Sequence, residues 1–159
     1  MLLWLLNGKK KVEMRLIDIL SNKSIKLNVS VESKNDLLEE LLFLVSLGGK
    51  VRDFNLARNS VYDRERIMVT GIGKGVAIPH SKSDAVSGAT ASLITLSEPV
   101  DYDSFDNIPV NIAIMILSPN ENPGIHLSLI GTIARFFQND SNRKKILKAR
   151  NSEEIFKLF

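Results

Sequence analysis

The chain contains only two histidines, and one of them ends a segment rich in glycine. Residues 71–86 have the sequence GIGKGVAIPHSKSDAV, in which three glycines and Pro79 come directly before His80. A neutral imidazole nitrogen is a nucleophile near pH 7, and glycines allow a main chain to approach a ligand closely. The segment therefore indicates either a loop that binds a nucleotide or a histidine held in place for chemistry.

The spacing of the glycines excludes the two common nucleotide-binding loops. The dinucleotide pattern G-x-G-x-x-G has Val76 at its last position when counted from Gly71, and Ile78 when counted from Gly73. A P-loop needs a lysine followed by Ser or Thr at the start of a helix, whereas Lys74 is followed by another glycine and an apolar segment. The glycines are therefore expected to form tight turns.

Pro79 favours an extended approach to the histidine. The proline ring fixes its own φ angle and disfavours the helical region for Ile78. Residues 75–78 are therefore predicted to form a short buried strand, which holds His80 at its end in a fixed position on the surface.

Helical and strand-like segments alternate along the chain. Strands are predicted at 24–31, 75–78, 89–96 and 109–117, and helices at 14–20, from 35 to the glycines at 48–49, and at 53–66, 126–138, 141–149 and 152–158. The continuous apolar character of 109–117 is typical of a strand that is covered on both faces. The pattern predicts an α/β fold in which a mixed β-sheet is sandwiched between helices.

The composition is that of one globular domain. The chain has 159 residues, of which 44% are hydrophobic and 25% are charged, so it can bury a single core. It has no cysteine, which excludes disulfides, thiolate metal sites and iron–sulfur clusters. Two histidines alone make a poor zinc site, so we expect no metal and no cofactor.

Charge and hydropathy argue against nucleic-acid and membrane partners. The 21 basic and 18 acidic residues give a net charge of +3, and the basic residues are scattered except at Lys9–Lys11 and Arg143–Lys145. The apolar opening, Met1 to Leu6, is much shorter than a membrane span, and its lysines follow it instead of preceding it as in a signal peptide. We expect a cytoplasmic protein without direct membrane insertion, with 1–13 as an N-terminal extension that need not be ordered and 14–159 as the domain.

A longer pattern of residues ends at His80. It comprises an acidic residue, an apolar residue with glycine, an apolar–Ala–apolar run and Pro-His, which are Glu65, Ile72–Gly73, Val76–Ala77–Ile78 and Pro79–His80. This pattern resembles the signature of the enzyme IIA domains of the phosphoenolpyruvate-dependent sugar phosphotransferase system (PTS), fructose/mannitol type. The resemblance covers the chain from about Met14 onward, including VYDRERIMVTGIGKGVAIPH, YDSFDNIPVNIAIMILSP and HLSLIGTIARFFQNDSNRKKIL.

The resemblance implies a role for particular residues. It makes His80 the phosphorylated nucleophile, places Arg64 in the lining of the active site and places His126 beside the phosphohistidine. The residue after the histidine is usually glycine or another very small residue, so Ser81 is a departure, although its hydroxyl can hydrogen-bond a phosphate. Gly73 is the remaining predicted site residue and is expected to support the phosphate site.

These residue types suit phosphoryl transfer. The planar guanidinium of Arg64 can donate to the equatorial oxygens, on which the charge of the transferred group is spread. Pro123–Gly124 are expected to break the preceding segment, and apolar residues follow at helical spacing, so His126 is predicted in the first turn of a helix. The free N–H groups and the positive end of the helix dipole favour an anion there.

Three functions are compatible with these residues and with the resemblance. The family's role is to accept a phosphoryl group from phospho-HPr and pass it to an enzyme IIB during sugar transport; this chain has no cysteine for a IIB-type acceptor, so IIB would be a separate chain. The second function is that of a nitrogen-regulatory IIA protein, which binds regulatory or transport targets according to its phosphorylation state. The third is a non-catalytic binding module, against which the presence of His80, Arg64 and His126 argues.

Overall fold

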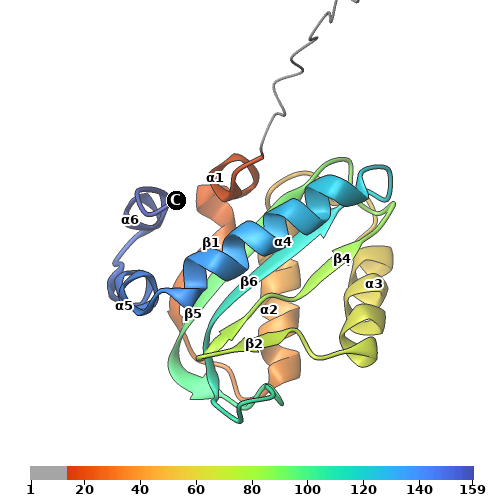
Figure 1. Cartoon of the computed structure of the whole chain (residues 1–159). Helices are drawn as coiled ribbons and strands as arrows, with labels where there is room; N and C mark the ends of the chain where they lie inside the picture. Colours follow the sequence, from red (N-terminus) through yellow and green to blue (C-terminus); the bar gives the residue numbers. More distant parts are fainter. Residues whose placement is uncertain (1–13) are drawn as a thin grey trace, which may run out of the picture.

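A mixed sheet of six strands forms the centre of the structure, a computed structural model that describes residues 14–159 (Figure 1). The strands are β1 (Ile25–Val29), β2 (Gly71–Gly73), β3 (Val76–Ala77), β4 (His80–Lys82), β5 (Thr90–Val100) and β6 (Val110–Ser118). Their order is β1-β5-β6-β3-β2, and β4 also pairs with β6. Strands β3 and β4 run parallel to β6, and β1 is parallel to β5, whereas the β5–β6 and β2–β3 pairs are antiparallel.

Helices cover both faces of this sheet (Figure 1), which confirms the predicted α/β sandwich. One face carries α2 (Lys34–Ser46) and α3 (Phe54–Ile67), and the other carries α1 (Leu16–Ile19), α4 (Pro123–Gln138), α5 (Asp140–Lys148) and α6 (Ser152–Phe156). A short 3₁₀ turn, Asn22–Ser24, leads into β1. Within residues 14–159 no helix is both long enough and apolar enough to cross a membrane. The extension expected at 1–13 lies outside the described residues.

Strand β6 is buried on both faces, as its apolar sequence predicts. Its odd-numbered residues from Ala113 to Leu117 lie in the core beneath α2 and α3. Its even-numbered residues from Ile112 to Ile116 lie in the core beneath α4. Because side chains alternate in direction along a strand, one apolar run contributes to two cores.

Helix α4 begins earlier than its predicted start at 126. The side chain of Asn122 accepts a hydrogen bond from the N–H of Ile125 at 3.3 Å and so caps the helix. Pro123 is the first helical residue, where a missing N–H costs nothing because no partner for it exists. Pro123 is therefore the first residue of the helix, three residues before the predicted start.

The strand predicted at 75–78 is shorter than expected, and a second strand that includes His80 follows it. Val76 lies opposite Ile112 and His80 lies opposite Ile116, so β3 and β4 follow β6 in one unbroken register. Pro79 lies in the gap between them; it has no N–H, but its carbonyl accepts a hydrogen bond from the N–H of Ile116 at 3.0 Å. His80 therefore begins β4 and does not end β3, which corrects the prediction.

Candidate active site

His80 lies between two open cavities near the end of α3. Their volumes are about 560 Å³ and about 540 Å³, and Arg64, His80 and Ile130 line both of them. Ser81 and His126 line only the larger one. We call this larger space the histidine cavity, because both histidines of the chain line it.

One ring nitrogen of His80 is already occupied. Its Nδ1 lies 2.7 Å from the carbonyl oxygen of Ile78, and a carbonyl can only accept, so Nδ1 donates. The neutral ring then carries its lone pair on Nε2. Burial lowers the pKa of His80; the hydrogen bond to Ile78 opposes this effect, and the charge of Arg64 adds to it. His80 is therefore a neutral imidazole near pH 7, with Nε2 as its nucleophilic atom.

Arg64 lines the site and contacts the backbone at the end of its own helix. It lies in the last turn of α3, and its Nη1 donates to the carbonyl oxygen of Met68 at 2.9 Å. A guanidinium has five N–H donors in a plane, so this contact fixes the group while leaving donors for an anion. Because Arg64 lines both cavities, its guanidinium can reach a group bound to His80.

His126 is the second imidazole of the histidine cavity and is almost fully buried, with 4% of its surface exposed. The ring centroids of His80 and His126 are 5.5 Å apart. Burial lowers the pKa of His126 to about 4, and the positive charge of His80 when it is protonated, followed by the charges of Lys82 and Arg64, acts in the same direction. His126 is therefore neutral at physiological pH and can donate through only one of its nitrogens.

The two remaining predicted residues lie in different places. Ser81 is buried in β4 and lines the histidine cavity, and its hydroxyl donates to the carbonyl oxygen of Lys82 at 3.2 Å. Gly73 lines neither cavity; it lies in the β2–β3 hairpin at φ +88°, where an added Cβ would come within 2.9 Å of Asp106. Gly73 is thus required by the hairpin, and we do not retain it as part of the phosphate site.

Two residues of the site were not anticipated from the sequence. Lys82 lines the histidine cavity, and it lies two residues after His80 on the same strand, so the strand period could have identified it. Ser118, at the end of β6, contacts Nδ1 of His126 through its hydroxyl. Its position in the sequence gives no signal, because an apolar strand that ends in serine is common.

The acidic residue that opens the sequence pattern has a structural role. Glu65 is 8% exposed, and its carboxylate accepts from the backbone N–H and the hydroxyl of Thr70, at 3.0 Å and 2.5 Å. Lys34 of α2 neutralises it, with Nζ 3.0 Å from the carboxylate, and the hydroxyls of Thr70 and Tyr102 are 3.1 Å apart. A buried carboxylate needs such partners.

Glu65 is connected to His80 through hydrogen bonds of the backbone. The carbonyl of Thr70 accepts from the N–H of Ile78 at 2.9 Å, and the carbonyl of Ile78 is the one that accepts from Nδ1 of His80. Glu65 therefore positions the peptide that orients the imidazole, although it does not itself touch His80.

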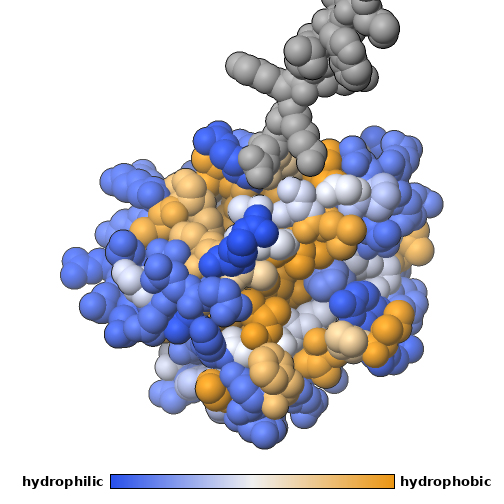
Figure 2. Space-filling view, viewed as in Figure 1, coloured by the Kyte–Doolittle hydropathy of each residue, from blue (hydrophilic) through white to orange (hydrophobic). Residues whose placement is uncertain are grey.

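Exposed apolar side chains surround the two cavities. Figure 2 shows apolar surface, drawn in orange, on the face formed by α4 and the end of α3. Four large apolar residues at this rim are between 67% and 80% exposed: Ile67, Met68, Phe105 and Leu127. An exposed apolar patch around a polar centre is typical of a surface that binds another protein.

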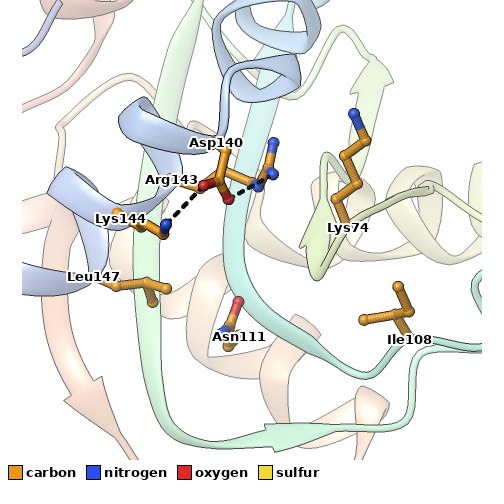
Figure 3. A pocket seen from close by; sticks show the side chains of 7 residues that line it. All are labelled: Lys74, Ile108, Asn111, Asp140, Arg143, Lys144 and Leu147. Carbon is orange, nitrogen blue, oxygen red and sulfur yellow. Dashed lines mark hydrogen bonds and ion pairs between the residues drawn. The ribbon is translucent and has the colours of Figure 1, made fainter.

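A third cavity, of about 410 Å³, lies at the other end of α4 (Figure 3). We call it the cationic cavity, and it is lined by Lys74, Ile108, Asn111, Asp140, Arg143, Lys144 and Leu147. Nη1 of Arg143 donates to the carbonyl oxygens of Phe137 and Gln138, and Asp140 pairs with both Arg143 and Lys144. Nζ of Lys74 donates to the side-chain oxygen of Gln138 at 3.2 Å, so the three cationic residues of this cavity all have partners within the protein.

Comparison with known proteins agrees with this fold and shows the family of the chain. A family described as "Phosphoenolpyruvate-dependent sugar phosphotransferase system, EIIA 2" matches residues 18–159. The chain is 32% identical to a PTS fructose-specific EIIA component of Haloferax volcanii, with 77% of this chain and 80% of that protein covered. It is 28% identical to a nitrogen regulatory protein of Pseudomonas aeruginosa, with 91% and 94% covered.

Other matches differ in length or are solved structures. The chain is 28% identical over 142 residues to a PTS fructose-specific EIIABC component of Bacillus subtilis, and it spans 22% of that protein's length. The crystal structure of the nitrogen regulatory protein IIA-Ntr from Neisseria meningitidis superposes with a TM-score of 0.82 at 31% identity and covers 89% of this chain and 97% of that one.

The family match over residues 18–159 and the similarity to these relatives place the chain in the class of IIA components of the phosphotransferase system. This chain belongs to the fructose/mannitol-type EIIA family of the phosphoenolpyruvate-dependent sugar phosphotransferase system.

Proposed function

We propose that the chain is a phosphocarrier that accepts a phosphoryl group from phospho-HPr on Nε2 of His80 and passes it to an enzyme IIB on a separate chain. The observation that carries this proposal is the state of His80: Nδ1 donates to Ile78, so Nε2 holds the lone pair of a neutral ring that lines both cavities. The relay acts between proteins ahead of a membrane component, so the proposed location is the cytoplasm.

The transfer step needs no group beyond the two proteins. The Nε2 lone pair of His80 attacks the phosphorus of the donor's phosphohistidine, and the donor's N–P bond breaks with its electron pair returning to the donor imidazole. Charge in transfer lies on the three equatorial oxygens. Arg64 and His126 are the proposed donors to these oxygens, and Ser81, whose hydroxyl now donates to Lys82, is a proposed further donor if it rotates. For delivery to IIB, His80 is the leaving group, and the same donors contact the oxygens of the phosphoryl group.

The surface around His80 supports a protein partner. The apolar rim of Ile67, Met68, Phe105 and Leu127 offers area to bury, and Arg64 lines both cavities together with the nucleophile. One chain of a solved complex of enzyme IIA-mannitol and phosphorylated enzyme IIB-mannitol from Escherichia coli has the same fold, with a TM-score of 0.75 at 17% identity. We propose HPr and IIB as successive occupants of this rim.

A nitrogen-regulatory role is the second candidate. It is supported by the similarity of the chain to the nitrogen regulatory proteins of Pseudomonas aeruginosa and Neisseria meningitidis, at 28% and 31% identity. In that role the phosphohistidine would form in the same way, but the phosphorylated and free forms would differ in their binding to regulatory or transport targets.

Reconstitution of the relay tests the proposal. The full chain is incubated with phosphoenolpyruvate, enzyme I and HPr, and acid-labile, base-stable phosphate is measured. We expect wild type and Arg143→Ala to be labelled and His80→Ala to remain unlabelled. Equal labelling of His80→Ala, or no labelling of wild type, would overturn the proposal. Passage of the label to a fructose- or mannitol-type IIB supports transport, and a label that every IIB leaves in place supports the regulatory role.

A further inference from the structure

We infer that Ser118 is a positioning residue that holds His126 in the Nε2–H tautomer, so that His126 presents an N–H donor to a phosphoryl group on His80. The first half of this inference concerns the unphosphorylated protein. The second half rests on the proposed function.

Ser118 connects the elements that carry the two histidines. It is the last residue of β6 and is 2% exposed. Its backbone carbonyl accepts from the N–H of Ser83 at 2.9 Å, directly after β4, the strand that begins with His80. Its hydroxyl lies within hydrogen-bond distance of Nδ1 of His126 on α4. One residue therefore fixes the end of β4 and the second imidazole at the same time.

The direction of the Ser118–His126 hydrogen bond follows from counting donors. Among residues 14–159, Nδ1 of His126 is the acceptor within reach of the Ser118 hydroxyl. If Nδ1 carried the proton and donated to Ser118, the buried hydroxyl hydrogen would have no acceptor in this part of the chain. An unsatisfied buried donor is costly, whereas an oxygen with a free lone pair is not. The hydroxyl therefore donates, and Nδ1 is unprotonated.

The tautomer decides what His126 can do. With Nδ1 as an acceptor, the neutral ring has its single N–H at Nε2. The His80 and His126 rings have their centroids 5.5 Å apart and are inclined by 57°, so a group bound to one ring is within reach of the other. The opposite tautomer would offer a lone pair to an anionic oxygen, which repels it.

A neutral donor also suits a relay. An imidazolium would hold the phosphoryl oxygens through its full charge and slow the departure of the group. In the unphosphorylated protein burial lowers the pKa of His126 to about 4, so the ring that meets an incoming phosphoryl group is neutral and donates through one N–H. Because Ser118 donates to Nδ1, the single N–H of this neutral ring lies on Nε2.

Nitrogen-15 NMR of histidine-labelled full chain tests the first half without any phosphorylation. We expect wild-type His126 in the Nε2–H form at pH 7. Ser118→Ala should give a mixture of both tautomers, and Ser118→Thr, which keeps a hydroxyl, should restore the wild-type form. If Ser118→Thr does not fold, Ser118→Cys, a weak donor, should give an intermediate mixture. An Nδ1–H form in wild type, or an unchanged tautomer in Ser118→Ala, would refute the inference.

A matched control separates this role from a general loss of stability. Ser92 is also buried, and its hydroxyl donates to the carbonyl oxygen of Leu41 at 2.8 Å, away from the histidines. Ser92→Ala should lower stability but leave the His126 tautomer and the transfer rate unchanged. Ser118→Ala should slow transfer from phospho-HPr by about tenfold. An unchanged rate with an altered tautomer would remove the second half only, and absence of labelling in wild type would remove the proposed function while the tautomer result stands.

Discussion

The two ends of helix α4 each border a cavity, and cationic residues line both cavities. The helix has 16 residues and so spans about 24 Å, with His126 in the histidine cavity near its start and Arg143 in the cationic cavity past its end. In the cationic cavity, Arg143 caps the last carbonyls of α4, and Asp140 pairs with Arg143 and Lys144 (Figure 3). In the histidine cavity, each imidazole keeps one nitrogen free of the contacts that orient it.

A cationic residue at the edge of a cavity is not sufficient for an anion-binding or catalytic site. The Arg143 guanidinium is used to close a helix end, so an anion there would compete with carbonyl and carboxylate partners. The Arg64 guanidinium makes one contact to its own helix end and retains donors beside an unprotonated nitrogen. Catalysis requires an arrangement like that of Arg64, in which a group is held in one orientation but still has hydrogen-bond donors that are not used within the protein.

The largest expected difference between the two ends of α4 is the effect of a substitution on the rate of phosphoryl transfer. Arg64→Ala removes the charged donors beside His80 and should slow phosphoryl transfer from phospho-HPr by about 10² to 10³, the usual effect of losing a transition-state donor. Its free energy of unfolding should change little, because the side chain is partly exposed. Rapid-quench labelling gives the rate and urea unfolding gives the stability. A rate equal to wild type would exclude Arg64 from the site.

The next difference is in the pH dependence of stability. The pKa of His126 is about 4 when folded and about 6.5 when unfolded. As the pH falls through this range, the unfolded chain binds a proton that the folded chain does not, so stability present above pH 6.5 is lost, by up to about 3 kcal/mol. The lowered pKa of His80 acts in the same direction.

Urea unfolding across this pH range measures the loss. His126→Gln, which cannot titrate, should lose less stability than wild type between about pH 6.5 and pH 4. Arg143→Ala, at the other end of α4, should lose as much as wild type. Parallel curves for wild type and His126→Gln would contradict the burial of a neutral His126.

The smallest expected difference is in stability at neutral pH. Arg143→Ala leaves the carbonyls of Phe137 and Gln138 without their side-chain donor and should lower the free energy of unfolding by about 2 kcal/mol. The transfer rate should remain that of wild type. A rate loss comparable to that of Arg64→Ala would mean that the cationic cavity takes part in transfer, and the distinction between the two ends would fail.

The fold could be predicted where the sequence pattern is repetitive. The apolar run of β6 predicted a strand covered on both faces, and the apolar spacing of α2 predicted its helix. The division of β3 from β4 could not be predicted, because it depends on the register against β6 and on Pro79, whose carbonyl remains paired although its N–H is missing. The predicted start of α4 is three residues too late, because proline breaks a helix interior but suits the first helical position.

The site could be predicted where the residues form one linear pattern. His80 and Arg64 come from a short stretch, and the structure places both of them in the lining of the same cavities. Ser118 could not be found in this way, because its contact with His126 depends on where β6 ends relative to α4. Glu65 belongs to the pattern, but its role as a buried anchor for Thr70 appears only when Lys34 of α2 is placed beside it.

The most direct test of the account is to determine which atom carries the phosphoryl group. Full chain labelled with nitrogen-15 histidine is phosphorylated through enzyme I and HPr, and NMR at alkaline pH identifies the nitrogen bonded to phosphorus. We predict Nε2 of His80, because Nδ1 donates to the carbonyl oxygen of Ile78. A phosphoryl group on Nδ1 of His80, or on His126, would contradict it.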